Sequence, residues 1–250
     1  MALVVLVHGA MGTPAELAPV EPALTRDGHR VEIVDLPCTD PDAKLGEYAD
    51  AVIAALGPPE QDPETLVVGH SFGGATIGLV RERRPDIELA YVTAVVPEPG
   101  QSLLELFLGA DPFDDPDVSD PWHAFDGLIV DAGPGLCRFD LDVMAATVPE
   151  AERAEFRSVL EATQREQGIA AMRDRWPGTA LPRDRISYVI ATRDTMIEPD
   201  LQRSMAARLG ADTHEVDSDH EVFLERPDEL GSILAGLASA LPRSSPGLGD

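Results

Sequence analysis

Cysteine is scarce in this chain of 250 residues, and so are basic side chains. The two cysteines, Cys38 and Cys137, lie far apart without C-x-x-C spacing, which indicates neither a disulfide-stapled scaffold nor a zinc site. Only 19 Lys and Arg oppose 45 Asp and Glu, for a formal net charge of -26. That balance argues against nucleic acid and anionic membrane surfaces as partners, and it predicts a solvated acidic surface.

Membrane and export signals are also missing from the sequence. No apolar run approaches the length of a transmembrane helix, and the N-terminus enters an apolar segment at once, without a basic region or a cleavage site. We therefore expect a soluble, cytoplasmic protein. The acidic, Ala-, Pro- and Arg-rich composition is typical of a bacterial genome rich in GC.

Short apolar runs alternate with helix-like segments over most of the chain. This alternation predicts an α/β fold, a doubly wound and mostly parallel sheet of about six strands covered on both faces. The expected strands are 3–7, 31–36, 65–68, 89–96, 185–191 and 213–216. The expected helices are 14–27, 45–56, 72–84, 199–209 and 221–241. We expect residues 1–97 and 184–241 to form this core.

Residues 98–183 break the alternation. An insertion of this size predicts a mainly helical cap, with helices at 140–146 and 149–167, over the sheet edge where α/β proteins bind ligands. The acidic stretch 111–126 is punctuated by proline and lacks an EF-hand pattern, so we expect a solvated, mobile lid and no metal site. The tail 242–250 is expected to be disordered.

The most informative motif is Gly69-His70-Ser71-Phe72-Gly73, which follows an apolar run and precedes helix-forming residues. A strand, then G-x-S-x-G, then a helix is the arrangement called a nucleophile elbow. The serine must occupy a tight, strained turn, and side chains two positions before and after it would collide with neighbouring backbone. The motif therefore predicts Ser71 as a nucleophile near a helix N-terminus.

A serine hydroxyl needs an adjacent base, which is itself oriented by a carboxylate. Asp194 and His220 follow Ser71 in the chain order that this arrangement requires, and each comes directly after an expected strand. Because the carboxyl ends of parallel strands meet at one edge, we expect the three side chains to form a triad. Asp217 and Asp219 are rival partners for His220, but they are too near in sequence to approach its ring easily.

An oxyanion hole needs two backbone N–H donors. We expect one from Phe72 and the other from Ala10, in the Gly-rich loop 8–12, which lacks the G-K-[ST] ending of a phosphate loop. Packing in the core is the commoner fate of large apolar side chains, but some of them must line a substrate pocket. The candidates for that pocket wall are Met11, Phe72, Trp122, Phe125 and Trp176.

These motifs resemble those of the α/β-hydrolases, in the branch that includes plant methylesterases and hydroxynitrile lyases. The resemblance covers 4–12, 66–74, the Asp194 loop through 202, and 219–227, whereas the cap matches poorly. It implies an α/β-hydrolase fold and a set of roles for individual residues. These are Ser71 as nucleophile, Asp194 as acid, His220 as base, and the N–H groups of Ala10 and Phe72 as the oxyanion hole.

The chain departs from that branch in two places. The lyases resemble one another in a Thr near the position of Ala10 and a Lys after the catalytic His, where this chain has Glu221. Both departures favour hydrolysis over cyanohydrin cleavage. The Trp typical of the first loop of the plant enzymes is absent as well, so their small aromatic esters are not implied as substrates.

We therefore expect a serine hydrolase, a carboxylesterase that cleaves a small-molecule ester, thioester or lactone through an acyl-enzyme on Ser71. The alternative is a biosynthetic enzyme on the same scaffold, such as a cyclase, a lyase or a cofactor-free haloperoxidase. A receptor that binds its ligand without turnover is a third possibility. We expect no cofactor and no metal, and either a monomer or a homodimer.

Overall fold

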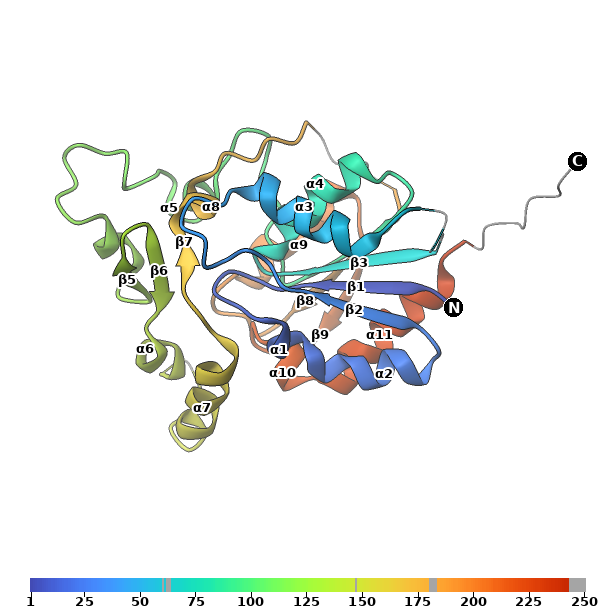
Figure 1. The fold of residues 1–250 in the computed structure, drawn as a ribbon. Coiled ribbons are helices and arrows are strands. Elements are labelled where there is room, and N and C mark those ends of the chain that lie inside the picture. The colour runs from blue at the N-terminus through green and yellow to red at the C-terminus, as the bar shows by residue number, and fades with distance from the viewer. Residues whose placement is uncertain (60, 62–63, 147, 180–183, 243–250) are drawn as a thin grey trace, which may run out of the picture.

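The computed structural model describes residues 1–59, 61, 64–146, 148–179 and 184–242. Its centre is a six-stranded parallel sheet, made of β1 Leu3–Val7, β2 Arg30–Val34, β3 Thr65–His70, β4 Glu88–Val92, β8 Ile186–Ala191 and β9 Asp212–Val216 (Figure 1). The strands pair in the order β2-β1-β3-β4-β8-β9. The predicted parallel sheet is confirmed. Strand β4 ends earlier than predicted because Thr93 takes a left-handed φ of 44°.

Strand β1 illustrates why this sheet is buried on both faces. All five residues of Leu3–Val7 are buried. Leu3, Val5 and Val7 join the apolar cluster on one face, while Val4 and Leu6 join the cluster on the other. Side chains alternate between the faces of a strand, so a strand covered on both sides is apolar throughout.

Helices cover each face of the sheet (Figure 1). One face carries α3 Leu45–Leu56, α4 Gly73–Arg83 and α9 Pro199–Leu209. The other carries α1 Pro14–Leu17, α2 Glu21–Arg26, α10 Val222–Glu225 and α11 Pro227–Ala240. The predicted helix 14–27 is interrupted by a 3-10 turn at Ala18–Val20, and the predicted helix 221–241 is divided before Pro227. Proline explains both breaks because it lacks a backbone N–H to continue the helix.

The segment between β4 and β8 forms a smaller layer at the end of the main sheet (Figure 1). Its helices are α5 Leu103–Leu108, the 3-10 helix η2 Pro121–Phe125, α6 Leu141–Ala145, α7 Arg153–Thr163 and α8 Ile169–Arg173. Its strands, β5 Ile129–Gly133, β6 Leu136–Phe139 and β7 Gln167–Gly168, form an antiparallel sheet. The sequence predicted no strands here. The predicted helix 149–167 is correspondingly shorter, because the chain becomes extended at Gln164, which bridges to Gly12, and then enters β7.

Several expectations from composition concern the whole chain. The expected disordered tail at 242–250 lies outside the described residues, apart from its first position. Within the part of the chain that the structure describes, no helix is both long enough and apolar enough to cross a membrane. In that same part, no group of three or more His, Cys, Asp or Glu side chains could hold a metal ion. Cys38 and Cys137 are both buried thiols, not joined in a disulfide.

Candidate active site

Ser71 stands in the turn between β3 and α4, with a positive φ of 50°. Two glycines make this turn possible. A Cβ at Gly69 would lie 2.9 Å from the backbone of Gly73, and a Cβ at Gly73 would lie 2.7 Å from the carbonyl oxygens of Val7 and His8. Neither contact is tolerable for a larger residue, so the glycines of the motif allow the close approach that presents the serine hydroxyl.

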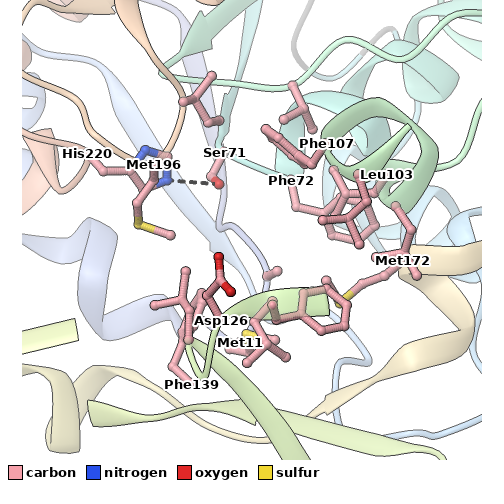
Figure 2. A pocket seen from close by; sticks show the side chains of 18 of the residues that line it. Met11, Ser71, Phe72, Leu103, Phe107, Asp126, Phe139, Met172, Met196 and His220 are labelled. Atoms are coloured by element: carbon pink, nitrogen blue, oxygen red, sulfur yellow. Dashed lines mark hydrogen bonds between the residues drawn. The ribbon is translucent and has the colours of Figure 1, made fainter. Parts of the chain in front are cut away.

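The structure brings Ser71, His220 and Asp194 together in one hydrogen-bonded row (Figure 2 shows the first pair). His220 Nε2 lies 3.0 Å from Ser71 Oγ, and His220 Nδ1 lies 2.8 Å from Asp194 Oδ2. A carboxylate can only accept, so Nδ1 carries the proton and Nε2 is left to accept from the serine hydroxyl. This is the geometry of a nucleophile, a base and an orienting acid.

Asp194 is buried and held by several donors. Its carboxylate accepts hydrogen bonds from the backbone N–H groups of Met196 and Ile197 and from the side-chain amide of Gln202, at 2.8 to 2.9 Å. Burial alone would raise the pKa of Asp194, but the electrostatic interaction and hydrogen bond with His220 and the hydrogen bonds from the N–H groups of Ile197 and Met196 outweigh it and hold the pKa below its ordinary value. The carboxylate therefore stays ionised beside the histidine ring.

The two rival carboxylates are engaged elsewhere. Asp217 pairs with Arg193 at 2.7 Å. Asp219 accepts a hydrogen bond from the backbone N–H of Glu221 at 2.9 Å. Both residues are too near His220 in the sequence to approach its ring easily, and these contacts show which groups hold them instead.

A second, buried layer supports His220 from behind. His70 Nδ1 lies 2.8 Å from Glu16 Oε1, and His70 Nε2 lies 3.1 Å from the carbonyl oxygen of His220. Burial alone would lower the pKa of His70, but the hydrogen bond and charge of Glu16 raise the pKa to about 9. An imidazolium can donate to both acceptors at once, as this geometry requires.

Sequence reasoning missed this second layer. Glu16 resembles an ordinary polar position of a surface helix, yet only 2% of its surface is exposed. Glu221 is buried as well, and its burial, followed by the charge of Glu16, raises the pKa of Glu221. His70 itself could have indicated this layer. A buried histidine inside the elbow motif needs partners for both ring nitrogens, and a carboxylate such as that of Glu16 can be one of them.

The two expected oxyanion donors lie beside Ser71, where Ala10 and Phe72 both line the cavity. The neighbouring N–H groups of Gly9, Met11 and Ser71 each have an acceptor. Among the residues that the structure describes, no acceptor engages the N–H of Ala10 or Phe72. The site thus keeps two unused backbone donors near the serine, as stabilisation of an oxyanion demands.

The loop that carries Ala10 is hydrogen-bonded to residues of the 164–167 segment in the smaller layer. Gln167 Oε1 accepts from the N–H of Met11 at 3.2 Å, and the N–H of Arg165 donates to the carbonyl of Met11 at 2.7 Å. The Arg165 guanidinium also donates to the carbonyl of Gly12 at 2.9 Å. The smaller layer therefore fixes the backbone of the loop beside the serine.

A cavity of about 450 Å³ opens over Ser71, between the sheet edge and the smaller layer (Figure 2). Most of its wall is apolar. Methionines contribute much of it, namely Met11, Met144, Met172 and Met196. Phenylalanines contribute its aromatic side chains, namely Phe72, Phe107, Phe125 and Phe139, and leucine, isoleucine and valine side chains complete the apolar wall. The polar side chains on the wall are those of Ser71, Asp126, Thr195 and His220.

Two of the predicted pocket residues lie away from this cavity. Trp176 is 2% exposed and donates from Nε1 to the carbonyl of Ala75 at 2.9 Å, so it packs in the core. Trp122 packs edge-on against Phe113, with ring centroids 4.9 Å apart, and is not on the cavity wall. Both tryptophans therefore pack against other apolar residues.

Comparison with known proteins agrees with this architecture. Polyneuridine aldehyde esterase of Rauvolfia serpentina is 31% identical over 108 residues, which are 40% of this chain and 41% of that enzyme. Methylesterase 2 of Arabidopsis thaliana is 32% identical over 104 residues, which are 38% of this chain and 40% of that protein. The matched segment thus spans about two fifths of the length of these curated relatives.

Solved structures match over nearly the whole chain. The crystal structure of a pyrethroid hydrolase from Sphingobium faniae JZ-2 superimposes with a TM-score of 0.72, covering 96% of this chain and 98% of that one at 24% identity. At that identity the likeness concerns the fold. The alpha/beta hydrolase family model matches residues 4–232. The chain therefore belongs to the alpha/beta hydrolase family, and its relatives include esterases.

Proposed function

We propose that this protein is a serine hydrolase that cleaves a carboxylic ester of a small molecule through an acyl-enzyme on Ser71. The observation that carries the proposal is the row from Ser71 Oγ through His220 to Asp194, with successive distances of 3.0 and 2.8 Å. Residues 98–183 act as a cap over this site, and residues 1–97 and 184–241 form the catalytic core. The esterase names of the curated relatives support the same reaction class.

In the first half-reaction, Ser71 Oγ attacks the carbonyl carbon of the ester while His220 Nε2 takes the hydroxyl proton. The carbonyl oxygen becomes an oxyanion, which accepts hydrogen bonds from the N–H groups of Ala10 and Phe72. Asp194 stabilises the imidazolium formed on His220. The tetrahedral intermediate then collapses, the bond to the alcohol breaks, and His220 returns its proton to the departing oxygen.

In the second half-reaction, water takes the place of the alcohol. His220 Nε2 accepts a proton from this water as its oxygen attacks the acyl carbon, and the same two N–H groups hold the second oxyanion. Collapse of this intermediate breaks the bond to Ser71 Oγ, which regains its proton from His220. The products are a carboxylic acid and the free enzyme.

The cavity supports an apolar acyl or alcohol group in the substrate, since its wall is built mainly of methionine, phenylalanine and branched aliphatic side chains. The two positions that differ from the lyases also favour hydrolysis. Glu221 follows the proposed base but is buried and is not among the cavity-lining residues, so no cation occupies that place.

The test combines turnover with covalent labelling. Wild type is expected to hydrolyse p-nitrophenyl butyrate and to be labelled at Ser71 by a fluorophosphonate, while Ser71→Ala loses about 10⁴-fold or more in kcat with the fold intact. Ser158→Ala, an exposed serine on α7, is the matched control and keeps full activity.

Two outcomes would overturn the proposal. Full activity in Ser71→Ala would mean that another group is the nucleophile. Labelling at Ser71 without turnover of alkyl, thioester or lactone substrates would favour a cyclase, a lyase or a haloperoxidase built on the same site.

A further inference from the structure

One carboxylate, that of Asp126, faces the largely apolar cavity. Figure 2 shows this side chain pointing into the cavity toward Ser71 and His220. Asp126 is the only Asp or Glu among the described residues that line the cavity, and no Lys or Arg from the described part of the chain lies on that wall. The cavity therefore holds one negative charge that no neighbouring cation on its wall offsets.

The local backbone aims Asp126 in this direction. It ends the 3-10 helix η2 in the left-handed region, with a φ of 49°, and Gly127 follows with a φ of 80°. Aspartate and asparagine tolerate this region better than other side chains that carry a Cβ. Such a turn is sharp, and it presents the side chain to the cavity instead of continuing the helix.

The carboxylate of Asp126 has no partner of its own among the residues that the structure describes. Other acids of the same stretch are engaged, since Arg173 pairs with both Asp111 and Asp114. Asp126 makes a backbone hydrogen bond to His123, but none of the hydrogen bonds or ion pairs of the described residues involves its side chain. A solvated carboxylate at the wall of a cavity is available to a ligand cation.

The aromatic part of the wall suits the same kind of ligand. Four of the seven phenylalanines of the chain line the cavity, and Phe125 directly precedes Asp126. The face of an aromatic ring attracts a cation, and a ring beside a carboxylate is a combination that recognises ammonium groups. A quaternary ammonium group suits it best, because it is both cationic and apolar on its surface.

We propose that Asp126 selects substrates that carry an ammonium group on an otherwise apolar body, so that the substrate class is a cationic ester. The proposal rests on the function proposed above, because it concerns the same cavity and the same nucleophile. Asp126 acts on binding and not on the chemical step, so its effect falls mainly on KM. An ester that carries a carboxylate is disfavoured by the same charge and by the net charge of -26.

The experiment compares isosteric pairs of esters that differ only in charge. In the first pair, the acyl chain of a p-nitrophenyl hexanoate ends in trimethylammonium or in tert-butyl. In the second pair, butyrate is esterified to choline or to the analogous alcohol in which carbon replaces nitrogen. The two pairs place the cation on the acyl side and on the alcohol side, and proton release measures the hydrolysis of all four.

The variant is Asp126→Asn, which removes the charge and keeps a residue that tolerates the left-handed turn. Asp117→Asn is the matched control, since Asp117 is an exposed acid of the same stretch that does not line the cavity. For at least one pair, Asp126→Asn is expected to lower the preference for the cationic ester by about tenfold, mainly through KM, while the control leaves it unchanged.

Binding in a protein without a nucleophile separates this proposal from the hydrolase proposal. Hexyltrimethylammonium is titrated into Ser71→Ala and into the double variant Ser71→Ala with Asp126→Asn, with calorimetric detection. An approximately tenfold weaker affinity in the double variant supports the ammonium site even if no ester is hydrolysed, which would overturn the hydrolase alone. Equal affinity in both proteins, or unchanged charge preference for both pairs, would overturn the role of Asp126.

Discussion

Replacing Glu16 with Gln tests whether a buried ion pair supports the site. The substitution keeps the shape of the side chain and removes the charge that faces His70 Nδ1 at 2.8 Å. Both side chains are almost fully buried, with 2% of their surface exposed. Removing one partner of a buried pair leaves the other charge uncompensated, which commonly costs about 3–5 kcal/mol.

The same interaction contributes to the raised pKa of His70. This pKa rises from 6.5 to about 9 in the folded protein. At about 1.4 kcal/mol per unit, this shift corresponds to about 3 kcal/mol of folding free energy at a pH where the histidine is charged in both states. The two routes agree, so we expect Glu16→Gln to lower the free energy of unfolding by about 3 kcal/mol near pH 6.

The sign of the pH dependence follows from the direction of the shift. A group whose pKa is raised by folding contributes its full stabilisation below the unfolded value of 6.5 and loses it as the pH rises through about 9. Wild type should therefore lose stability over this window, while Glu16→Gln should lose much less. The difference between the two proteins should shrink toward zero above about pH 9.

Urea unfolding from about pH 6 to about pH 9.5 measures these differences. Glu32→Gln is the matched control, because the Glu32 side chain is exposed on β2 and takes part in none of the side-chain hydrogen bonds or ion pairs found among the described residues. Its unfolding curve should follow wild type at every pH. A constant difference between wild type and Glu16→Gln over the whole window would refute a charged His70.

Two further substitutions probe the contacts around the cavity. Gln167→Met removes the acceptor of the Met11 N–H, so kcat should fall about tenfold with KM little changed; lower stability with unchanged kinetics would show that the contact is only structural. Trp176→Phe removes the hydrogen bond to the Ala75 carbonyl, so the free energy of unfolding should fall by about 1–3 kcal/mol while kcat/KM stays within about twofold. A large rise in KM without loss of stability would contradict its place in the core.

The main sheet and the row of catalytic candidates were predictable because they depend on local patterns. Apolar runs such as Leu3–Val7 show a buried parallel strand directly in the sequence. Ser71 and Asp194 each follow such a run, and His220 follows the more polar strand β9. Parallel strands place their carboxyl ends together. The hydrogen-bonded row of the three side chains can therefore be inferred from the parallel arrangement of the strands, without knowledge of contacts between distant segments.

The smaller layer was harder to predict because its structure depends on contacts between segments far apart in the chain. Strand β7 has only two residues, and it exists because Gln167 and Gly168 pair with β6. Strand β5 contains Asp131 and Gly133, which favour loops over strands in sequence-based reasoning. Burial of Trp176 against α4 is a tertiary property of the same kind. No local pattern distinguishes it from a tryptophan on a pocket wall.

The four methionines on the cavity wall have a consequence for how this protein recognises its substrate. A thioether side chain is unbranched and turns about three bonds at little cost, so a wall of Met11, Met144, Met172 and Met196 can reshape around molecules of different outline. One cavity can then accept substrates of different shapes and still select those that carry a positive charge. The same sulfur atoms oxidise to polar sulfoxides, which would make this wall the part of the site most sensitive to oxidants.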